Sequence, residues 1–259
     1  MAEAAFNGIW VVDFGGQYNR LIARRVREAH VYCEVVPWFK CAERLADERP
    51  AGMIFTGGPA SVYAEGAPKL PRAFFESDVP ILGICYGMQM MAHVLGGSVH
   101  SPDYKEYGRV ALRRLRADDA SDMDGAGLGD PLLADLPMET VCWMSHTDYV
   151  ARVPEGFRVC AQTDNCPAAV MENAARRLYG VQFHPEVHHT PFGQKLLTNF
   201  LYGVCGCAGD WTMANFAKAK TEEIRRRVGD GRVLCALSGG VDSSVAAVLT
   251  HKAVGDRLT

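Results

Sequence analysis

The sequence of 259 residues lacks any long apolar run, and this absence excludes several classes of protein. A helix that spans a bilayer needs about 18 or more mostly apolar residues in succession, and no such stretch occurs. The first residues also lack the basic stretch, apolar core and small-residue cleavage site of a secretion signal. We therefore expect a cytoplasmic protein, neither exported nor inserted in a membrane.

The sequence also lacks an excess of charge of one sign. Lys and Arg number 27 against 30 Asp and Glu, which gives a net charge of −3, and the pI is near 6.2. A nucleic acid or an anionic membrane would call for a basic surface. We therefore expect neither as a partner.

Cysteine is present but shows no regular spacing. The nine cysteines are odd in number and scattered, which suits a reducing compartment better than a disulfide framework. Cys205 and Cys207 are too isolated to supply the four ligands that zinc usually takes. We therefore predict no metal site.

Alternating apolar runs and amphipathic segments predict an α/β fold with a mixed, mostly parallel open sheet and helices on both faces. The expected elements of the first hundred residues are strands at Ile9–Phe14, Cys33–Val36, Gly52–Phe55 and Ile81–Ile84, and helices at Tyr18–Ala29 and from Tyr86. Five shorter β-like segments follow, at Arg109–Leu112, Thr140–Met144, Phe157–Thr163, Ala168–Glu172 and Leu178–Phe183. Between them, Ala117–Asp130 is rich in Asp and Gly, which predicts a surface loop.

The composition near residue 205 predicts a boundary between two domains. A helix at Phe192–Cys205 closes the first domain, residues 1–205, and residues 206–259 form a linker and part of a second domain. In this second part we expect a linker at Gly206–Trp211, a charged helix at Met213–Val228 and a buried strand at Val233–Leu237.

The string Gly83-Ile84-Cys85-Tyr86-Gly87 predicts a nucleophile on a sharp turn from strand to helix. Glycines at both flanks make such a corner sterically possible, as in the G-x-S-x-G turn of serine hydrolases. The positive end of the following helix favours the thiolate. Cys85 is therefore the candidate nucleophile.

His184-Pro185-Glu186, 99 positions after Cys85, supplies the other groups that a thiol nucleophile needs. Residues two apart in an extended segment project to the same side. His184 is therefore predicted as the general base and then acid, and Glu186 as the residue that orients its ring. The backbone N–H groups of Tyr86 and of Gly57 or Gly58, in Thr56-Gly57-Gly58-Pro59, are predicted to bind the oxyanion.

These motifs, with Gln89 and with Trp143-Met144-Ser145-His146, resemble those of the class I glutamine amidotransferases over about residues 7 to 203. The resemblance implies that Cys85 forms a γ-glutamyl thioester from L-glutamine, that water then releases glutamate, and that no cofactor takes part. It also implies that Gln89 and the main chain around Ser145 and His146 position the glutamine. Thr147 departs from the pattern, since glycine often follows Ser-His in such proteins.

A second motif follows the predicted strand at Val233–Leu237. The string Ser238-Gly239-Gly240-Val241-Asp242-Ser243-Ser244 combines glycines, hydroxyls and the start of an apolar helix, a combination that can cradle phosphate. It lacks the lysine of the Walker motif. It resembles the pyrophosphate loop of the ATP pyrophosphatases, which adenylate an oxygen that ammonia then displaces.

A glutaminase followed by an ATP pyrophosphatase resembles the family of glutamine-hydrolysing GMP synthases. The resemblance implies that ammonia aminates xanthosine monophosphate (XMP) to GMP, with ATP and Mg²⁺ as the cofactors of a full-length synthetase. Because the second motif begins close to Thr259, we expect an incomplete ATP site in this chain and no GMP synthesis by it alone.

Two alternatives stay open at this point. One is the glutaminase subunit of a different complex, of the anthranilate or aminodeoxychorismate synthase type. The other is a regulatory module that keeps the fold without catalysis. The string Ser238–Ser244 weighs against the first alternative, and the set Cys85, His184 and Glu186 weighs against the second.

Overall fold

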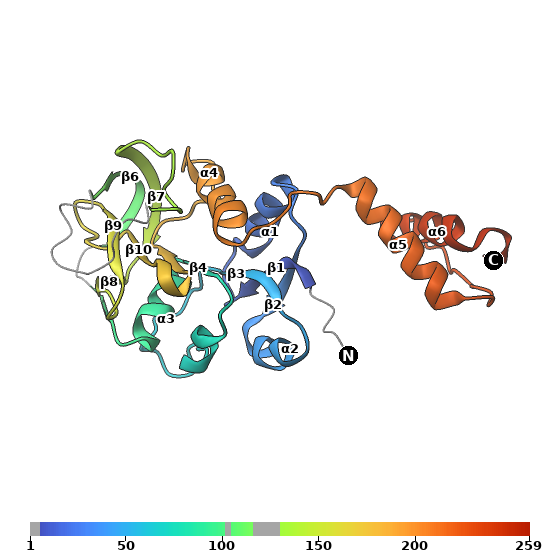
Figure 1. Cartoon of the computed structure of the whole chain (residues 1–259), viewed down its shortest axis with the longest axis horizontal. Coiled ribbons are helices and arrows are strands. Elements are labelled where there is room, and N and C mark those ends of the chain that lie inside the picture. Colours follow the sequence, from blue (N-terminus) through green and yellow to red (C-terminus); the bar gives the residue numbers. More distant parts are fainter. Residues whose placement is uncertain (1–5, 102–104, 116–129) are drawn as a thin grey trace. The chain divides into compact units, whose positions relative to one another are not determined.

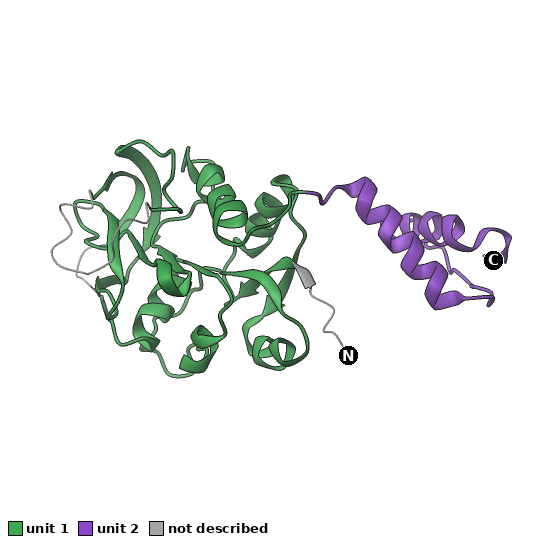
Figure 2. Ribbon diagram, in the orientation of Figure 1, with its two compact units in different colours: residues 1–209 green, residues 210–259 purple. Residues whose placement is uncertain are grey.

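A computed structural model describes residues 6–101, 105–115 and 130–259 (Figure 1). The chain divides into two compact units, Met1–Gly209 and Asp210–Thr259 (Figure 2). The surface loop predicted at residues 117–130 lies outside the described residues except for Asp130. In the described part, no helix combines the length and the apolar character that a membrane crossing requires.

The first unit is built on one mixed sheet of nine strands, in the order β2-β1-β3-β4-β11-β10-β9-β6-β7. The strands are β1 (Phe6–Asp13), β2 (Cys33–Pro37), β3 (Pro50–Phe55), β4 (Ile81–Ile84), β6 (Glu106–Arg114), β7 (Glu139–His146), β9 (Arg158–Gln162), β10 (Val170–Asn173) and β11 (Leu178–Val181). β2, β1, β3, β4 and β11 pair in parallel, and the other four continue antiparallel from β11. A two-stranded sheet joins β5 (Ser98–His100) and β8 (Tyr149–Arg152).

Helices cover both faces of the large sheet, as the sequence predicted. Along β1, Ile9 and Val11 face one core cluster, and Trp10 and Val12 face the other. Residues of α1 (Asn19–Glu28) and α4 (Gly193–Thr198) belong to the first cluster. Residues of α2 (Cys41–Asp47) and α3 (Tyr86–Val94) belong to the second. The parallel strands are therefore buried on both sides, which explains their continuous apolar runs.

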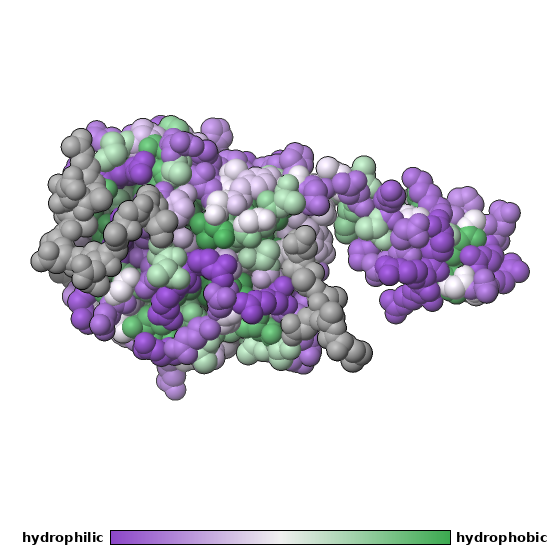
Figure 3. All heavy atoms as spheres, in the orientation of Figure 1, coloured by the Kyte–Doolittle hydropathy of each residue, from purple (hydrophilic) through white to green (hydrophobic). Residues whose placement is uncertain are grey.

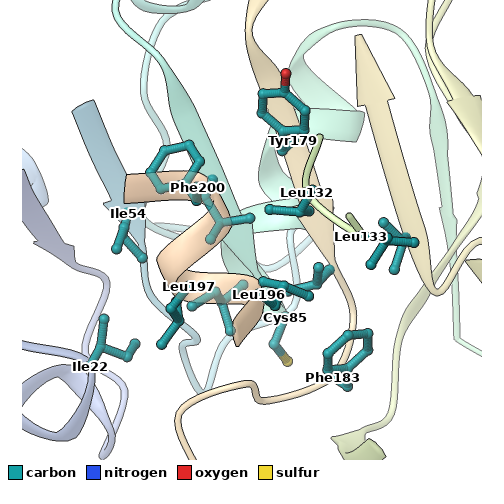
Figure 4. Packing of buried hydrophobic residues seen from close by; sticks show 14 of the residues in the cluster. Ile22, Ile54, Cys85, Leu132, Leu133, Tyr179, Phe183, Leu196, Leu197 and Phe200 are labelled. Atoms are coloured by element: carbon teal, nitrogen blue, oxygen red, sulfur yellow. The ribbon is translucent and has the colours of Figure 1, made fainter. Parts of the chain in front are cut away.

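Short helical segments complete this unit. Three of them are η1 (Trp38–Lys40), η2 (Arg72–Glu76) and η4 (Ala174–Arg176). The helix predicted at Phe192–Cys205 is α4 followed by a wider π-helical turn, η5 (Asn199–Val204). Figure 4 shows α4 packed with Leu196 and Leu197 beside Cys85, so the sheet's first core cluster reaches the predicted nucleophile.

The second unit contains α5 (Met213–Val228), α6 (Val241–Val254) and a short turn, η6 (Gly255–Arg257). α5 has the bounds that the charged, amphipathic pattern predicted. The prediction of a buried strand at Val233–Leu237 is wrong, because Val233 forms only an isolated bridge with Leu258. The side chains of Leu234 and Leu237 are 82% and 60% exposed. An apolar run forms a buried strand only where neighbouring strands pair with it on both sides, and here the pairing is limited to residues 257–259.

The visible surface is mostly polar. On the face in Figure 3, hydrophilic residues predominate on each unit, and smaller apolar areas lie among these hydrophilic residues. The distribution agrees with a chain in which 22% of the residues are charged and 48% are hydrophobic.

Candidate active site

Cys85 lies at the corner between β4 and α3, in a conformation that few side chains adopt. Its φ and ψ are +51° and −106°, in the half of conformational space that L-residues avoid. Such strain typically costs about 1–3 kcal/mol and persists only where the surroundings enforce it. Here β11 holds the corner, because Cys85 N–H donates to the Val181 carbonyl at 2.8 Å.

The two glycines that flank Cys85 serve close packing. Neither Gly83 nor Gly87 has a positive φ. A Cβ atom on Gly83 would approach Met88 N to 2.6 Å, and one on Gly87 would approach Phe55 O to 2.6 Å. At both positions two backbone segments are in direct contact. A side chain at either position would therefore push the corner away from its neighbours.

His184 and Glu186 follow β11, the strand next to β4. His184 Nδ1 lies 2.7 Å from Glu186 Oε1, and the two residues are 5% and 0% exposed. Thr190 Oγ1 donates to the His184 carbonyl at 2.7 Å, and Arg25 Nε donates to the Glu186 carbonyl at 3.0 Å. These backbone contacts fix the segment that carries both side chains.

The charge state of His184 depends on competing effects. Burial lowers its pKa, but hydrogen bonds with Cys85 and Glu186 and the charges of these two groups outweigh burial and raise the pKa to about 10. The ring therefore carries a proton at neutral pH. A positively charged imidazole attracts a negatively charged thiolate. Its proton can also be transferred to a leaving amine.

The two glycines predicted at the oxyanion site lie beside the same groups. A Cβ on Gly57 would lie 3.3 Å from His184 Cε1 and 3.7 Å from Cys85 Cβ. One on Gly58 would lie 2.9 Å from the Phe14 carbonyl and 3.3 Å from the ring of Tyr86. Tyr86 is the first residue of α3, so its N–H belongs to the first helical turn, where backbone donors have no intrahelical acceptor.

A pocket of about 710 Å³ opens over these residues. Its lining includes the predicted site residues Gly57, Gly58, Cys85, Gln89, Ser145, His146 and His184. Gln89 Nε2 donates to the Asp148 carbonyl at 2.5 Å and to Gln182 Oε1 at 3.2 Å. Thr147 also lines the pocket, and its φ is not positive, so the turn there does not require glycine.

One residue of this site received no role from the sequence. Gln182 is fully buried, and its Nε2 lies 3.6 Å from Cys85 Sγ. A signal was present, since Gln182 precedes His184 by two positions and therefore projects to the same side of an extended segment. Its amide links the nucleophile to Gln89.

The second predicted motif lies in the other unit. Ser238, Gly239 and Gly240 precede α6, and Val241, Asp242, Ser243 and Ser244 form its first turn. Gly239 has a φ of +80°. The hydroxyls of Ser243 and Ser244 donate to the Gly240 carbonyl, at 3.0 and 2.9 Å. The loop is thus exposed at a helix N-terminus, the position that phosphate binding requires.

Among the described residues, one group brings three possible cation ligands together, namely Asp130, Cys160 and Glu172. None of the three lines the pocket. Arg158 already donates to Glu172 and neutralises part of the negative charge there. The group therefore has no part in the chemistry at Cys85.

Similar solved structures share the fold of the first unit. A protein from Thermoplasma acidophilum, described as a subunit of GMP synthase, is 28% identical, with a TM-score of 0.63 over 77% of this chain and 94% of that one. A glutamine amidotransferase from Thermotoga maritima is 15% identical, with a TM-score of 0.56 over 76% and 97%. The second likeness concerns the fold alone.

Curated relatives match over a longer stretch. The GMP synthase (glutamine-hydrolyzing) of Clostridium perfringens is 55% identical over 251 residues, which are 97% of this chain and 47% of that protein. The enzyme of the same name from Acetivibrio thermocellus is 57% identical, with the same coverage. The chain thus spans about half the length of these relatives. The family described as glutamine amidotransferase class-I matches residues 10–204, and the chain belongs to this family.

Proposed function

We propose that this chain hydrolyses L-glutamine to glutamate and ammonia, with Cys85, His184 and Glu186 as the catalytic residues. The observation that carries the proposal is the buried relay in which Glu186 holds His184 and His184 interacts with Cys85. Membership of the glutamine amidotransferase class-I family supports the same reaction.

The proposed reaction has two halves. The Cys85 thiolate attacks the side-chain amide carbon of glutamine, and the N–H groups of Tyr86 and Gly58 stabilise the oxyanion. His184 then gives its proton to the leaving nitrogen, and ammonia departs from a γ-glutamyl thioester. In the second half His184 takes a proton from water, the hydroxide attacks the thioester carbon, and glutamate leaves as the thiolate is restored.

The pocket offers a binding region for the rest of the substrate. Gln89 and the segment from Ser145 to Asp148 line it together with Cys85 and His184. We assign the binding of glutamine to Gln89 and to the main chain around Ser145 and His146. Gln182 holds the Gln89 side chain in place next to the nucleophile, because its amide contacts both Gln89 and Cys85.

The ammonia would serve an ATP-dependent amination of XMP to GMP. Relatives named GMP synthase match 251 residues, so the similarity includes most of the second unit as well as the first. This extent weighs against a glutaminase subunit of the anthranilate or aminodeoxychorismate type. We propose that Ser238 to Ser244 bind the pyrophosphate of ATP, with Mg²⁺, once the rest of a synthetase domain is supplied.

The apolar residues exposed on the second unit support this view. Val241, Val245 and Val248 of α6 are 79%, 52% and 54% exposed. Only Ala253 and Val254 of that helix are buried. An apolar helix face of this kind fits the interior of a larger domain.

The test is glutamate release by the purified chain and by its Cys85→Ala variant. The variant should lose glutamate release by at least about a thousandfold, because Cys85 is the only cysteine among the described residues that line the pocket. A Cys41→Ala variant, which removes a buried thiol in the other core cluster, should retain it. Equal rates for wild type and Cys85→Ala would refute the proposal.

A further inference from the structure

Glu106 is a buried carboxylate without a lysine or arginine partner in the described part of the chain. It opens β6, and its side chain is only 6% exposed. Its oxygens accept a hydrogen bond from Thr163 Oγ1 at 3.1 Å, and Oε2 lies 3.3 Å from His146 Nε2. Burying a carboxylate costs free energy unless its oxygens are hydrogen-bonded, and the Thr163 hydroxyl and the His146 ring are the groups placed to contact them.

The His146 ring in turn depends on Glu106 for its orientation. The residue is buried, with 6% of its surface exposed. Its Nδ1 has no hydrogen-bond partner among the described residues. Glu106 therefore makes the only polar contact to the ring within the described part, and it does so at Nε2.

This pair joins the wall of the pocket, which His146 itself lines, to the neighbouring strand. Glu106 and His146 are opposite each other in the antiparallel register of β6 and β7. β7 ends at His146, and both His146 and the next two residues line the pocket. Asp148, the last of them, receives the amide of Gln89 on its carbonyl. The position of this wall is thus coupled to the end of β7.

A third segment is tied to the same carboxylate. Thr163 Oγ1, besides donating to Glu106, accepts hydrogen bonds from the N–H groups of Cys166 and Asn165 at 2.9 and 3.3 Å. Glu106 thereby connects the start of β6, the end of β7 and the turn after β9. These segments are distant in the chain, and no other described side chain joins all three by hydrogen bonds.

We propose that Glu106 is a positioning residue for glutamine. Through the His146 ring it holds the wall from His146 to Asp148 in the conformation that receives the amino-acid end of the substrate. It does not touch the reacting atoms. The inference rests on the proposed glutaminase activity and assigns a role in substrate binding to a residue outside the catalytic set.

The experiment compares two reagents that alkylate Cys85 in the full chain. 6-Diazo-5-oxo-L-norleucine carries the α-amino and α-carboxylate groups of glutamine, whereas iodoacetamide lacks them. The alkylation rate at Cys85 is followed by peptide mass spectrometry for wild type, Glu106→Ala and Glu106→Gln. Glu172→Gln is the matched control, because Glu172 is also a buried carboxylate of this sheet but its hydrogen-bond partner is Arg158, which does not line the pocket.

We expect Glu106→Ala to slow the glutamine-shaped reagent about tenfold relative to iodoacetamide, the effect of losing one good hydrogen bond to a charged group. KM for glutamine should rise by a similar factor, with a smaller change in kcat. Glu106→Gln keeps one acceptor oxygen and should give an intermediate ratio. Glu172→Gln should keep the wild-type ratio.

The possible results separate this inference from the proposed function. An unchanged ratio of the two rates in Glu106→Ala overturns the positioning role, as does an equal loss with both reagents. If Glu106→Ala does not fold, Glu106→Gln decides by the same ratio. A wild-type chain that neither releases glutamate nor reacts preferentially with the glutamine-shaped reagent would instead refute the glutaminase proposal.

Discussion

At the scale of single residues, the protonation of His184 makes the stability of the protein depend on pH. Its pKa is raised to about 10, although burial alone would lower it. A histidine has a pKa of about 6.5 in an unfolded chain. The native state therefore binds the proton more tightly than the unfolded state does, and this preference stabilises the fold.

The sign of the pH dependence follows from this difference. The stabilisation from His184 is complete below about pH 6.5 and is lost as the pH rises through about 10. In Glu186→Gln the carboxylate charge is gone, so the pKa should rise less and the stability should fall less over this range. Urea unfolding of both proteins at pH 6, 8 and 10 measures the difference. Parallel curves for the two proteins would contradict it.

The same variant should also lose activity. A glutamine at position 186 can present its N–H₂ group to the ring and favour the wrong tautomer, which in a comparable triad costs about 10⁴ in kcat. Glutamate release at a single pH between 7 and 8 is the direct readout. Full activity in Glu186→Gln would show that Glu186 does not orient His184.

The residue scale also shows what the sequence can and cannot predict about a site. Cys85 was predicted from the glycines that flank it, and His184 and Glu186 were predicted from their spacing of two residues. Both patterns lie within a few consecutive residues of the sequence. Glu106 and Gln182 were not predicted, because their partners lie 40 and 97 positions away and depend on strand pairing. For Gln182 the two-residue spacing from His184 was the one local signal, and for Glu106 the contacts that define its role become visible only when the strands are paired.

At the scale of elements, the corner between β4 and α3 depends on close backbone packing. In Gly87→Ala the new Cβ would meet Phe55 Cβ and O at 2.7 and 2.6 Å. We expect a loss of about 1–3 kcal/mol in unfolding free energy, together with loss of glutamate release as Cys85 moves.

Gly203→Ala provides the matched control for this substitution. Gly203 lies in the helical segment η5 and has no positive φ, and a Cβ added there would meet no atom within 4 Å. The same chemical change should therefore leave stability and activity close to wild type. Chemical denaturation of both variants tests the pair, and equal losses would show that close packing is not the cause.

Among the elements, segments with a clear apolar run were predicted, even short ones such as β4, and segments without one were not. The strands β1 to β4 and the helix α5 follow from apolar runs and amphipathic spacing. β5 and β8 each bury a single residue, so no apolar run marks them in the sequence. The strand predicted at Val233–Leu237 failed for another reason, since its apolar pattern is clear but its pairing is limited to an isolated bridge with Leu258.

At the scale of the whole chain, the division into two compact units predicts that the first unit folds and acts without the second. Every residue proposed for glutamine hydrolysis lies in Met1–Gly209. The predicted boundary after residue 205 and the compact unit ending at Gly209 both fall within a short stretch rich in glycine.

A chain that ends at Gly209 should therefore fold and release glutamate at a rate within about twofold of the full chain. Calorimetry and the glutamate assay on both lengths provide the measurement. The full chain with Ser238→Ala serves as a control that leaves the first unit untouched. Loss of folding in the shorter chain would show that Asp210–Thr259 belongs to the same cooperative unit.

The pairing of β4 with β11 has a consequence for how the catalytic centre is specified. Four consecutive residue pairs, from Leu178 opposite Ile81 to Val181 opposite Ile84, set the alignment of two strands that lie far apart in the chain. The sulfur and the imidazole emerge just beyond this ladder, so their separation in space is independent of the length of chain between them. A shift of one residue in this register would turn the side chains of one strand to the opposite face of the sheet and so separate His184 from Cys85.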